Sequence, residues 1–280
     1  MVQNIKSVLI GVTKEFGPDE VSSVLGYGLS LAQQAGAHVT VQAASVKVAV
    51  STARVSRVVA GIVQEENQRL RALAEAVARC AQGDAGAAGV VCTTAAPHLN
   101  YPELLAVFRA QAGLHDLTVI DAEPEALTPD RGLIETLLMD SGRPLLVVPP
   151  GQEVFRARRI ILAWDGSGRA ARAVADALPL LRAAETVEVV AVTGEKDLAD
   201  TVTGADIAPH LSRHGVHVEV RPLPALKGDV AETLRNHATL THADMIVMGG
   251  YVHSRLRELV FGGVTQSLLR QSPVPLFMAY

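Results

Sequence analysis

Short runs of valine, isoleucine and leucine alternate along this chain with longer alanine-rich stretches whose apolar residues recur at helical spacing. This alternation is typical of strand-helix-strand units that build a parallel sheet buried on both faces. It therefore predicts an α/β fold. In the first half we expect strands at Ser7–Val12, His38–Ala43, Gly89–Thr93, Leu117–Asp121 and Pro144–Val148, and helices at Glu20–Ala35, Ala60–Ala81, Pro102–Ala112 and Gly132–Asp140. The small residues of Gly83–Gly89 predict a turn after the long second helix.

The pattern occurs a second time. Strands are expected at Arg159–Trp164, Thr186–Val192, Val216–Arg221, Met245–Gly249 and Pro275–Ala279, and helices at Arg169–Ala184, Asp200–His214, Val230–Thr241 and Gly263–Gln271. The closing segments SGRPLLVV and SPVPLFMA, at residues 141–148 and 272–279, also resemble each other. We therefore predict two tandem doubly wound domains, residues 1–149 and 159–280, each with a five-stranded parallel sheet flanked by helices. The linker Pro149–Arg158 opens with Pro-Pro-Gly, which breaks regular structure.

The composition excludes several classes of partner. Of the 280 residues, 49% are hydrophobic and 19% are charged, which suffices for a substantial core. A net charge of −4 leaves no basic footprint for nucleic acid or anionic lipid. No stretch reaches the roughly 18 uninterrupted apolar residues of a membrane span, and the N-terminus lacks a signal-peptide core. Cys80 and Cys92 are too few for a disulfide framework, so we expect a cytoplasmic protein.

Two segments of the second half carry polar chemistry at strand ends. Ligands of open parallel sheets bind beyond the carboxyl ends of the strands, where the strand order reverses. Asp165 directly follows the first strand of this half, and the stretch GGYVHSRLRELVFGGVT, residues 249–265, follows the fourth. First and fourth strands are neighbours in doubly wound orders, so we expect the two segments to face each other.

The second segment has the composition of an anion site. Gly262 and Gly263 open the last helix, whose N-terminus presents unpaired N–H groups and a partial positive charge. Ser254 and Arg255 supply further donors, while His253 either contacts a phosphate or lies in solvent. Simpler interpretations stay open: a loop that enters a helix without any ligand, and an Asp165 that serves as the cap of the next helix.

These residues resemble those of a known family. The spacing Gly249, residue 252, nine intervening residues and then Gly262-Gly263-Val264-Thr265 is similar to the GxxG–x9–G(S/T) nucleotide loop of universal stress proteins. The second half resembles the family along its whole length, whereas the first half resembles it in layout alone. The resemblance implies a tandem universal stress protein with a Rossmann-like fold of the adenine nucleotide alpha hydrolase type.

The resemblance also implies a ligand, an adenine nucleotide such as ATP, with or without Mg²⁺. Asp165 would lie beside the adenine and ribose, and the glycines would surround the phosphates. The residues implied at the site are Ala163, Trp164, Asp165, Val192, Met248, Gly249, Gly250, Val252, His253, Ser254, Arg255, Gly262, Gly263, Val264 and Thr265. The chain departs from the motif twice. Val252 stands at the second glycine of GxxG, and Gly263 stands where nucleotide binders carry serine or threonine, so a hydroxyl contact depends on Thr265.

The first half departs further from the motif. Asp121, Glu123 and Glu125 follow its fourth strand, and carboxylates at a helix entrance repel phosphate. Its first strand is followed by Thr13 and Lys14, with no aspartate that corresponds to Asp165. We therefore predict a structural role for the first half.

Neither a catalytic nor a metal motif emerges from the chain. GxSxG, GxxxxGK(S/T) and HExxH are absent, so we do not expect an enzyme, although slow ATP hydrolysis is compatible with a nucleotide site. His210 and His214 share a helix face, yet no third ligand stands near them in the sequence, and no metal is expected. Alternation along the strand directs Trp164 towards the core.

Two functional hypotheses remain. The first is a nucleotide-binding stress-response protein. The second is a nucleotide-independent interaction module in which two similar halves pair, either within the chain or in a homodimer. The last strand mediates pairing in the resembled family, and the segments Pro144–Val148 and Pro275–Ala279 are apolar enough to pair with each other.

Overall fold

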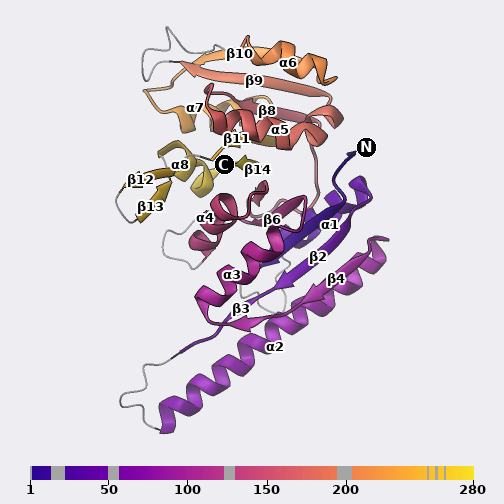
Figure 1. Cartoon of the computed structure of the whole chain (residues 1–280), viewed down its shortest axis with the longest axis vertical. Coiled ribbons are helices and arrows are strands. Elements are labelled where there is room, and N and C mark those ends of the chain that lie inside the picture. The colour runs from indigo at the N-terminus through magenta and orange to yellow at the C-terminus, as the bar shows by residue number, and fades with distance from the viewer. Residues whose placement is uncertain are drawn as a thin grey trace.

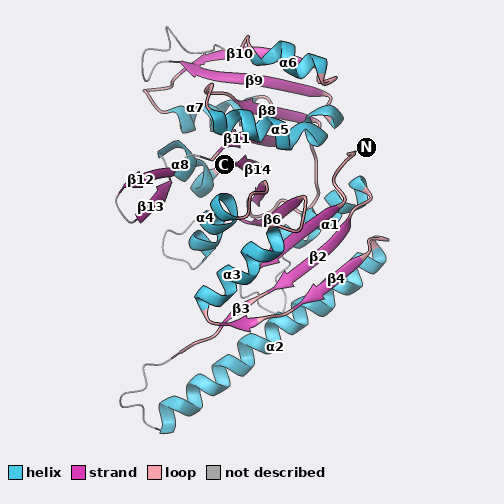
Figure 2. Ribbon diagram, in the orientation of Figure 1, coloured by secondary structure: helices cyan, strands magenta, loops and turns pink. Residues whose placement is uncertain are grey.

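The computed structural model describes residues 2–13, 23–49, 57–122, 130–193, 204–250, 252–255, 258–261 and 263–280. In these ranges a single ten-stranded sheet runs through the molecule with helices on both faces (Figures 1 and 2), which confirms the predicted α/β class. Its strands are β1 (Ser7–Val12), β2 (His38–Ala43), β4 (Cys92–Ala95), β6 (Leu117–Asp121), β7 (Leu145–Val148), β8 (Arg159–Ala163), β9 (Thr186–Thr193), β10 (Val218–Pro224), β11 (Met245–Gly249) and β14 (Leu276–Ala279). Two small two-stranded sheets pair β3 (Ser45–Val46) with β5 (His98–Leu99) and β12 (Val252–Arg255) with β13 (Glu258–Phe261).

The strand order is β10-β9-β8-β11-β14-β7-β6-β1-β2-β4. Within each half the first strand lies between the second and the fourth, and the fifth strand follows the fourth. Within the ten-stranded sheet, all pairs inside a half are parallel, as the buried aliphatic runs predict. The sequence repeat is therefore a repeat of topology.

The two halves meet along their last strands. β14 pairs with β7 in antiparallel register, with Phe277 opposite Leu146 and Met278 opposite Leu145. The apolar closing segments thus pair within the chain and fuse the two parallel sheets into one. We call this β7–β14 contact the seam.

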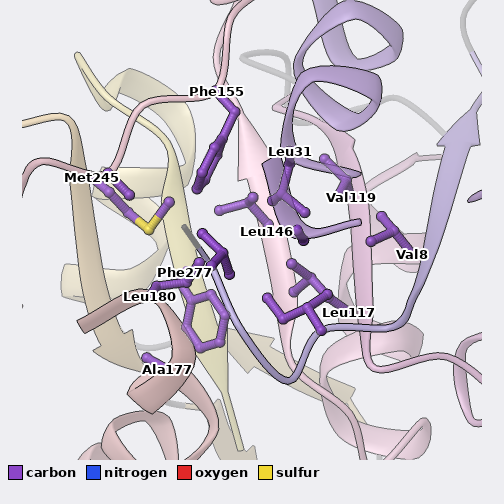
Figure 3. Close-up of a cluster of buried hydrophobic side chains, with 14 of the residues drawn as sticks. Val8, Leu31, Leu117, Val119, Leu146, Phe155, Ala177, Leu180, Met245 and Phe277 are labelled. Atoms are coloured by element: carbon purple, nitrogen blue, oxygen red, sulfur yellow. The ribbon is translucent and has the colours of Figure 1, made fainter. Parts of the chain in front are cut away.

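The helices cover the sheet in two layers. They are α1 (Ser23–Ala35), α2 (Arg57–Ala87), α3 (Tyr101–Ala112), α4 (Asp130–Asp140), α5 (Gly168–Ala183), α6 (Ile207–Arg213), α7 (Val230–Leu240) and α8 (Gly263–Gln271). Side chains of α1, α2, α5 and α6 belong to one core cluster, and those of α3, α4, α7 and α8 belong to a second cluster on the opposite face. The first cluster crosses the seam, where Leu146 and Phe277 pack beside Leu180 and Met245 (Figure 3).

Several predicted boundaries are wrong for local reasons. Helix α2 continues into the predicted turn at 83–89 because Ala81 and Ala85 are fully buried against the sheet. It ends at Ala87, and the chain then turns at Gly89, whose φ of 68° suits glycine. The strand predicted at Gly89–Thr93 accordingly begins later, at Cys92. Helix α6 is shorter than predicted and begins at Ile207, and residues 200–203 of the predicted helix lie outside the described ranges.

Candidate functional site

The carboxyl ends of β8 and β11 lie side by side. The two strands are hydrogen-bonded neighbours in parallel register, with Ile160 opposite Met245 and Leu162 opposite Val247. Asp165 follows the first strand and Gly249 ends the second, so the two segments singled out by the sequence meet at one edge of the sheet. The expected adjacency of first and fourth strands is confirmed.

Asp165 is exposed at this edge, but it does not cap the next helix. Its Oδ1 accepts a hydrogen bond from the backbone N–H of Ser167 at 2.9 Å. Ser167 itself is the N-cap of α5, and its Oγ accepts from the N–H of Ala170 at 3.1 Å. The alternative of an Asp165 cap is therefore wrong, because the serine two residues later takes that position. The aspartate shapes the turn and keeps its carboxylate at the surface.

Gly249 and Gly250 are required by close packing. A Cβ atom at Gly249 would stand 2.6 Å from the backbone nitrogen of Ala170, and one at Gly250 would stand 2.5 Å from Leu138 of the first half. The N–H of Gly250 also donates to the carbonyl of Ala279 at 2.7 Å. These two glycines thus allow β11 to approach the start of α5 and the neighbouring half. Their presence is explained without a ligand.

The segment after Gly250 is a hairpin and not an open loop. The backbones of β12 and β13 pair antiparallel, with Val252 opposite Phe261 and Arg255 opposite Glu258. β-branched and aromatic residues at the ends of this stretch favour strands. The prediction of a loop relied on the glycines and did not use this signal. The side chains of Val252, His253, Ser254 and Arg255, and the whole of Gly262, lie outside what the structure describes. Their predicted contacts stay predictions.

Helix α8 begins at Gly263, as predicted. Gly263 is exposed, and a Cβ built there meets no described atom within 4 Å, so residue 263 has room for a side chain. Val264 is half-buried, whereas Thr265 is 1% exposed. The hydroxyl of Thr265 is therefore enclosed by protein, which argues against its predicted contact with an anion.

The remaining implied residues form the floor of this edge. Trp164 is 9% exposed and belongs to the core cluster of the α1/α5 face, as strand alternation predicts. Its indole N–H has no hydrogen-bond partner in the described ranges. Met248 is buried in the opposite cluster, against which Ala163 and Val192 pack while half-buried. The aliphatic members thus present hydrophobic surface and no polar group.

The corresponding edge of the first half differs. Asp121 ends β6 and is half-buried, while Glu123 and Glu125 lie outside the described residues. Nearby, β3 and β5 bring together a polar pair that the sequence did not suggest, with Ser45 Oγ 2.9 Å from His98 Nδ1. Burial lowers the pKa of His98, and the charges of Lys47 and Arg71 lower it further. The contact arises because β3 and β5 pair in parallel with Ser45 opposite His98. Since these residues are far apart in the sequence, no local sequence pattern predicts it.

No group of three or more His, Cys, Asp or Glu side chains that could hold a metal ion occurs among the described residues. The rings of His210 and His214 do lie edge-on to each other, with centroids 4.6 Å apart. However, Nη2 of Arg182 lies 3.1 Å from Nδ1 of His214. A guanidinium at this distance repels a cation.

Residues 156–279 match the universal stress protein family. This half of the chain belongs to the universal stress protein family. The stress response protein NhaX of Bacillus subtilis (strain 168) is 28% identical over 167 residues, which covers 45% of this chain and 99% of NhaX. The family match and this relative together support a universal stress protein role.

Solved universal stress proteins share the fold over nearly the whole chain. The crystal structure of a universal stress protein from Archaeoglobus fulgidus DSM 4304 superimposes with a TM-score of 0.67 at 17% identity, covering 97% of this chain and 95% of that one. A putative universal stress protein from Pseudomonas aeruginosa UCBPP-PA14 gives a TM-score of 0.53 at 16% identity, covering 98% and 93%. The fold of the first half therefore also occurs in these solved structures. None of the helices in the described ranges has the length and hydrophobicity to cross a membrane.

Proposed function

We propose that the universal stress protein half binds an adenine nucleotide, ATP, at the carboxyl ends of β8 and β11, and that it acts as a stress-response regulator that hydrolyses the nucleotide slowly or not at all. The observation that carries this proposal is the pairing of β8 with β11, whose carboxyl ends lead to the exposed Asp165 and, past Gly249, towards the exposed start of helix α8 at Gly263. A carboxylate suits ribose hydroxyls, and the N–H groups of a helix entrance suit phosphate.

The residues at this edge fit the nucleotide in part. Asp165 uses Oδ1 for the turn, which leaves Oδ2 to accept a further hydrogen bond. The α8 entrance offers backbone donors, and the half-buried Ala163 and Val192 offer apolar surface for a base. Thr265 does not fit the role of a phosphate ligand, since its side chain is enclosed. When Mg²⁺ accompanies the nucleotide, it neutralises phosphate charge.

The proposed roles of these residues are to bind and to orient. Fast phosphoryl transfer to water requires a group that positions the attacking water and further charges that stabilise the transition state. Asp165 accepts a hydrogen bond from the backbone N–H of Ser167, and its proposed role is to accept hydrogen bonds from the ribose hydroxyls. We therefore expect ATP to be retained as a signal and not to be turned over quickly.

The experiment is a calorimetric ATP titration of the wild type, Gly263→Asp and Gly263→Asn. Both substitutions enter open space, and aspartate at a helix start is favourable to the helix, so both variants should fold. The carboxylate of Gly263→Asp should weaken ATP binding by about tenfold or more, whereas the uncharged Gly263→Asn should stay within about threefold of the wild type. Equal binding by the two variants would refute the proposed phosphate position.

A second function is favoured by the seam, where the two halves pair strand to strand. In this alternative the chain is a nucleotide-independent interaction module of the stress response, and a homodimer is one form that it takes. Purified protein that releases no adenine nucleotide on denaturation, and that gives no heat with millimolar ATP, would favour this function over the first.

A further inference from the structure

A second concave site lies at the opposite edge of the universal stress protein half. Two adjoining cavities of about 280 and 640 Å³ open where the linker passes the start of β8 and β11. Both are lined by Val154, Arg156, His242 and Asp244, and the smaller one is also lined by Tyr27 of the first half and by Val274. We call these six residues and the space between them the junction cleft.

Tyr27 brings an unsatisfied polar atom to the junction cleft. The residue is 1% exposed, and its hydroxyl has no hydrogen-bond partner within the described part of the chain. Its ring packs edge-on against Phe155, with centroids 5.6 Å apart, so the side chain is held in place. Burial raises the pKa of Tyr27, and the charge of Asp244 raises it further, so the hydroxyl stays a neutral donor. A buried donor without an acceptor is costly, and an acceptor from a bound molecule would remove that cost.

The charges around the junction cleft favour an anion. Arg156 is exposed and makes no ion pair or hydrogen bond with any residue that the structure describes. Asp244, an acidic residue in the lining, already accepts at Oδ2 from the backbone N–H groups of Arg158 and Arg159. The Arg158 side chain is paired with Glu185 at 2.6 Å. The guanidinium of Arg156 is thus left to bind a ligand.

Part of the remaining lining is apolar. Val154 and Val274 stand beside Ala243 and Pro273 in the smaller cavity, where Gln152 and Thr239 add neutral polar groups, so a ligand there has hydrocarbon walls next to the Arg156 cation and the Tyr27 donor. Sites for small molecules combine such walls with a few polar groups that fix the orientation.

We propose that the junction cleft binds a small carboxylate with a short apolar body. The carboxylate pairs with the Arg156 guanidinium and accepts a hydrogen bond from the Tyr27 hydroxyl, while the apolar body lies against Val154 and Val274. Since Tyr27 belongs to the first half and Arg156 to the linker, this ligand would bridge the halves. The site is separate from the proposed nucleotide site.

The test is a calorimetric titration of the full chain with pentanoate, alongside pentanol and acetate. We expect pentanoate to bind at millimolar or lower concentration, and the other two at least about tenfold more weakly, because each lacks one half of the recognition. Arg156→Gln should weaken pentanoate binding by about tenfold and leave ATP binding unchanged. Failure of the nucleotide proposal alone would therefore leave the pentanoate result intact.

Tyr27→Phe gives the sharper readout. Loss of the unsatisfied hydroxyl should raise the melting temperature of the ligand-free protein by about 2 °C and at the same time weaken pentanoate binding several-fold. Thr118→Val is the matched control, because the Thr118 hydroxyl is likewise buried without a described partner but lies outside the junction cleft. It should raise the melting temperature without any change in binding.

Three outcomes would overturn the proposal. One is the absence of pentanoate heat in the wild type. Another is equal binding of pentanoate by the wild type, Arg156→Gln and Tyr27→Phe. The third is binding of pentanol or acetate as tightly as pentanoate, which would identify an unspecific apolar or anionic surface.

Discussion

Asp116 and Asp244 make the same contact in the two halves of the chain. Each Oδ2 atom accepts two backbone hydrogen bonds at the start of the first strand of its own half: from Lys6 and Ser7 at 2.8 and 3.0 Å for Asp116, and from Arg158 and Arg159 at 2.8 and 2.9 Å for Asp244. Each aspartate thereby fastens the amino end of the first strand to that of the fourth. The internal repeat therefore includes the hydrogen bonds made by one side-chain atom, the Oδ2 of this aspartate, in each half.

Asp116→Ala and Asp244→Ala should each destabilise the protein by about 1–3 kcal/mol, because each leaves two N–H groups without their acceptor. The core cluster continues across the seam, so both variants should shift one common unfolding transition in urea. Asp140→Ala is the control, since Asp140 is exposed at the end of α4, and it should stay within about 0.5 kcal/mol of the wild type. Separate transitions for the two halves would contradict the idea of one cooperative sheet.

Gly249→Ala and Gly263→Ala should differ in effect although both glycines belong to the same motif. The new methyl group at residue 249 would meet the backbone of Ala170 at 2.6 Å, so we expect a loss of about 1–3 kcal/mol. At residue 263 it would meet nothing described within 4 Å, so the change should stay within about 0.5 kcal/mol. Denaturant unfolding distinguishes the two, and similar losses at both positions would show that the packing argument is mistaken.

Phe277→Ala should weaken the seam strongly. Phe277 is 1% exposed and lies opposite Leu146 of the other half, so its truncation leaves a cavity between the halves. The expected cost is about 3–5 kcal/mol in the free energy of unfolding. Phe277→Leu should recover most of this loss because it refills much of the volume. Thermal unfolding of both variants measures the effect, and a small loss for the alanine variant would mean that the seam contributes little to stability.

His98 should make the protein less stable in acid. Its pKa in the folded protein is lowered, so the unfolded chain binds this proton more readily than the folded one does. Above the pKa of an unfolded histidine, about 6.5, His98 costs the folded protein no stability. As the pH falls from that pKa to the lower pKa of the folded state, the free energy of unfolding decreases. His98→Asn cannot take up the proton, so its unfolding free energy should fall less between about pH 7 and pH 5 than that of the wild type. Parallel pH dependences for the two proteins would exclude this role of His98.

The regular part of the fold was predictable because buried parallel strands carry a strong local signal. The runs Ser7–Val12 and Met245–Gly249 form strands with the predicted bounds. The end of α2 was not predictable in the same way, since the glycines and alanines of 83–89 look like a turn until their packing against the sheet is known. Tertiary burial overrides weak local propensity there.

The adjacency of the two strand ends could be predicted from the sequence, whereas the contacts of the individual side chains there could not. Strand order placed Asp165 beside Gly249, and the structure agrees. What sequence spacing could not reveal is which groups face outwards. Ser167 caps α5 in place of Asp165, and Thr265 is enclosed. The junction cleft was missed altogether, because Tyr27 and Asp244 are 217 positions apart and meet only through the paired halves.

At the seam each closing strand has a neighbour on both sides: β7 lies between β6 and β14, and β14 lies between β7 and β11. Neither has a free row of backbone donors and acceptors with which to recruit another molecule. The pairing of last strands therefore takes place within one chain, and a homodimer must form through other surfaces. Strands β4 and β10, which stand at the two ends of the sheet, belong to such surfaces. Higher assembly of this protein is thus expected to follow a geometry other than pairing through the last strands.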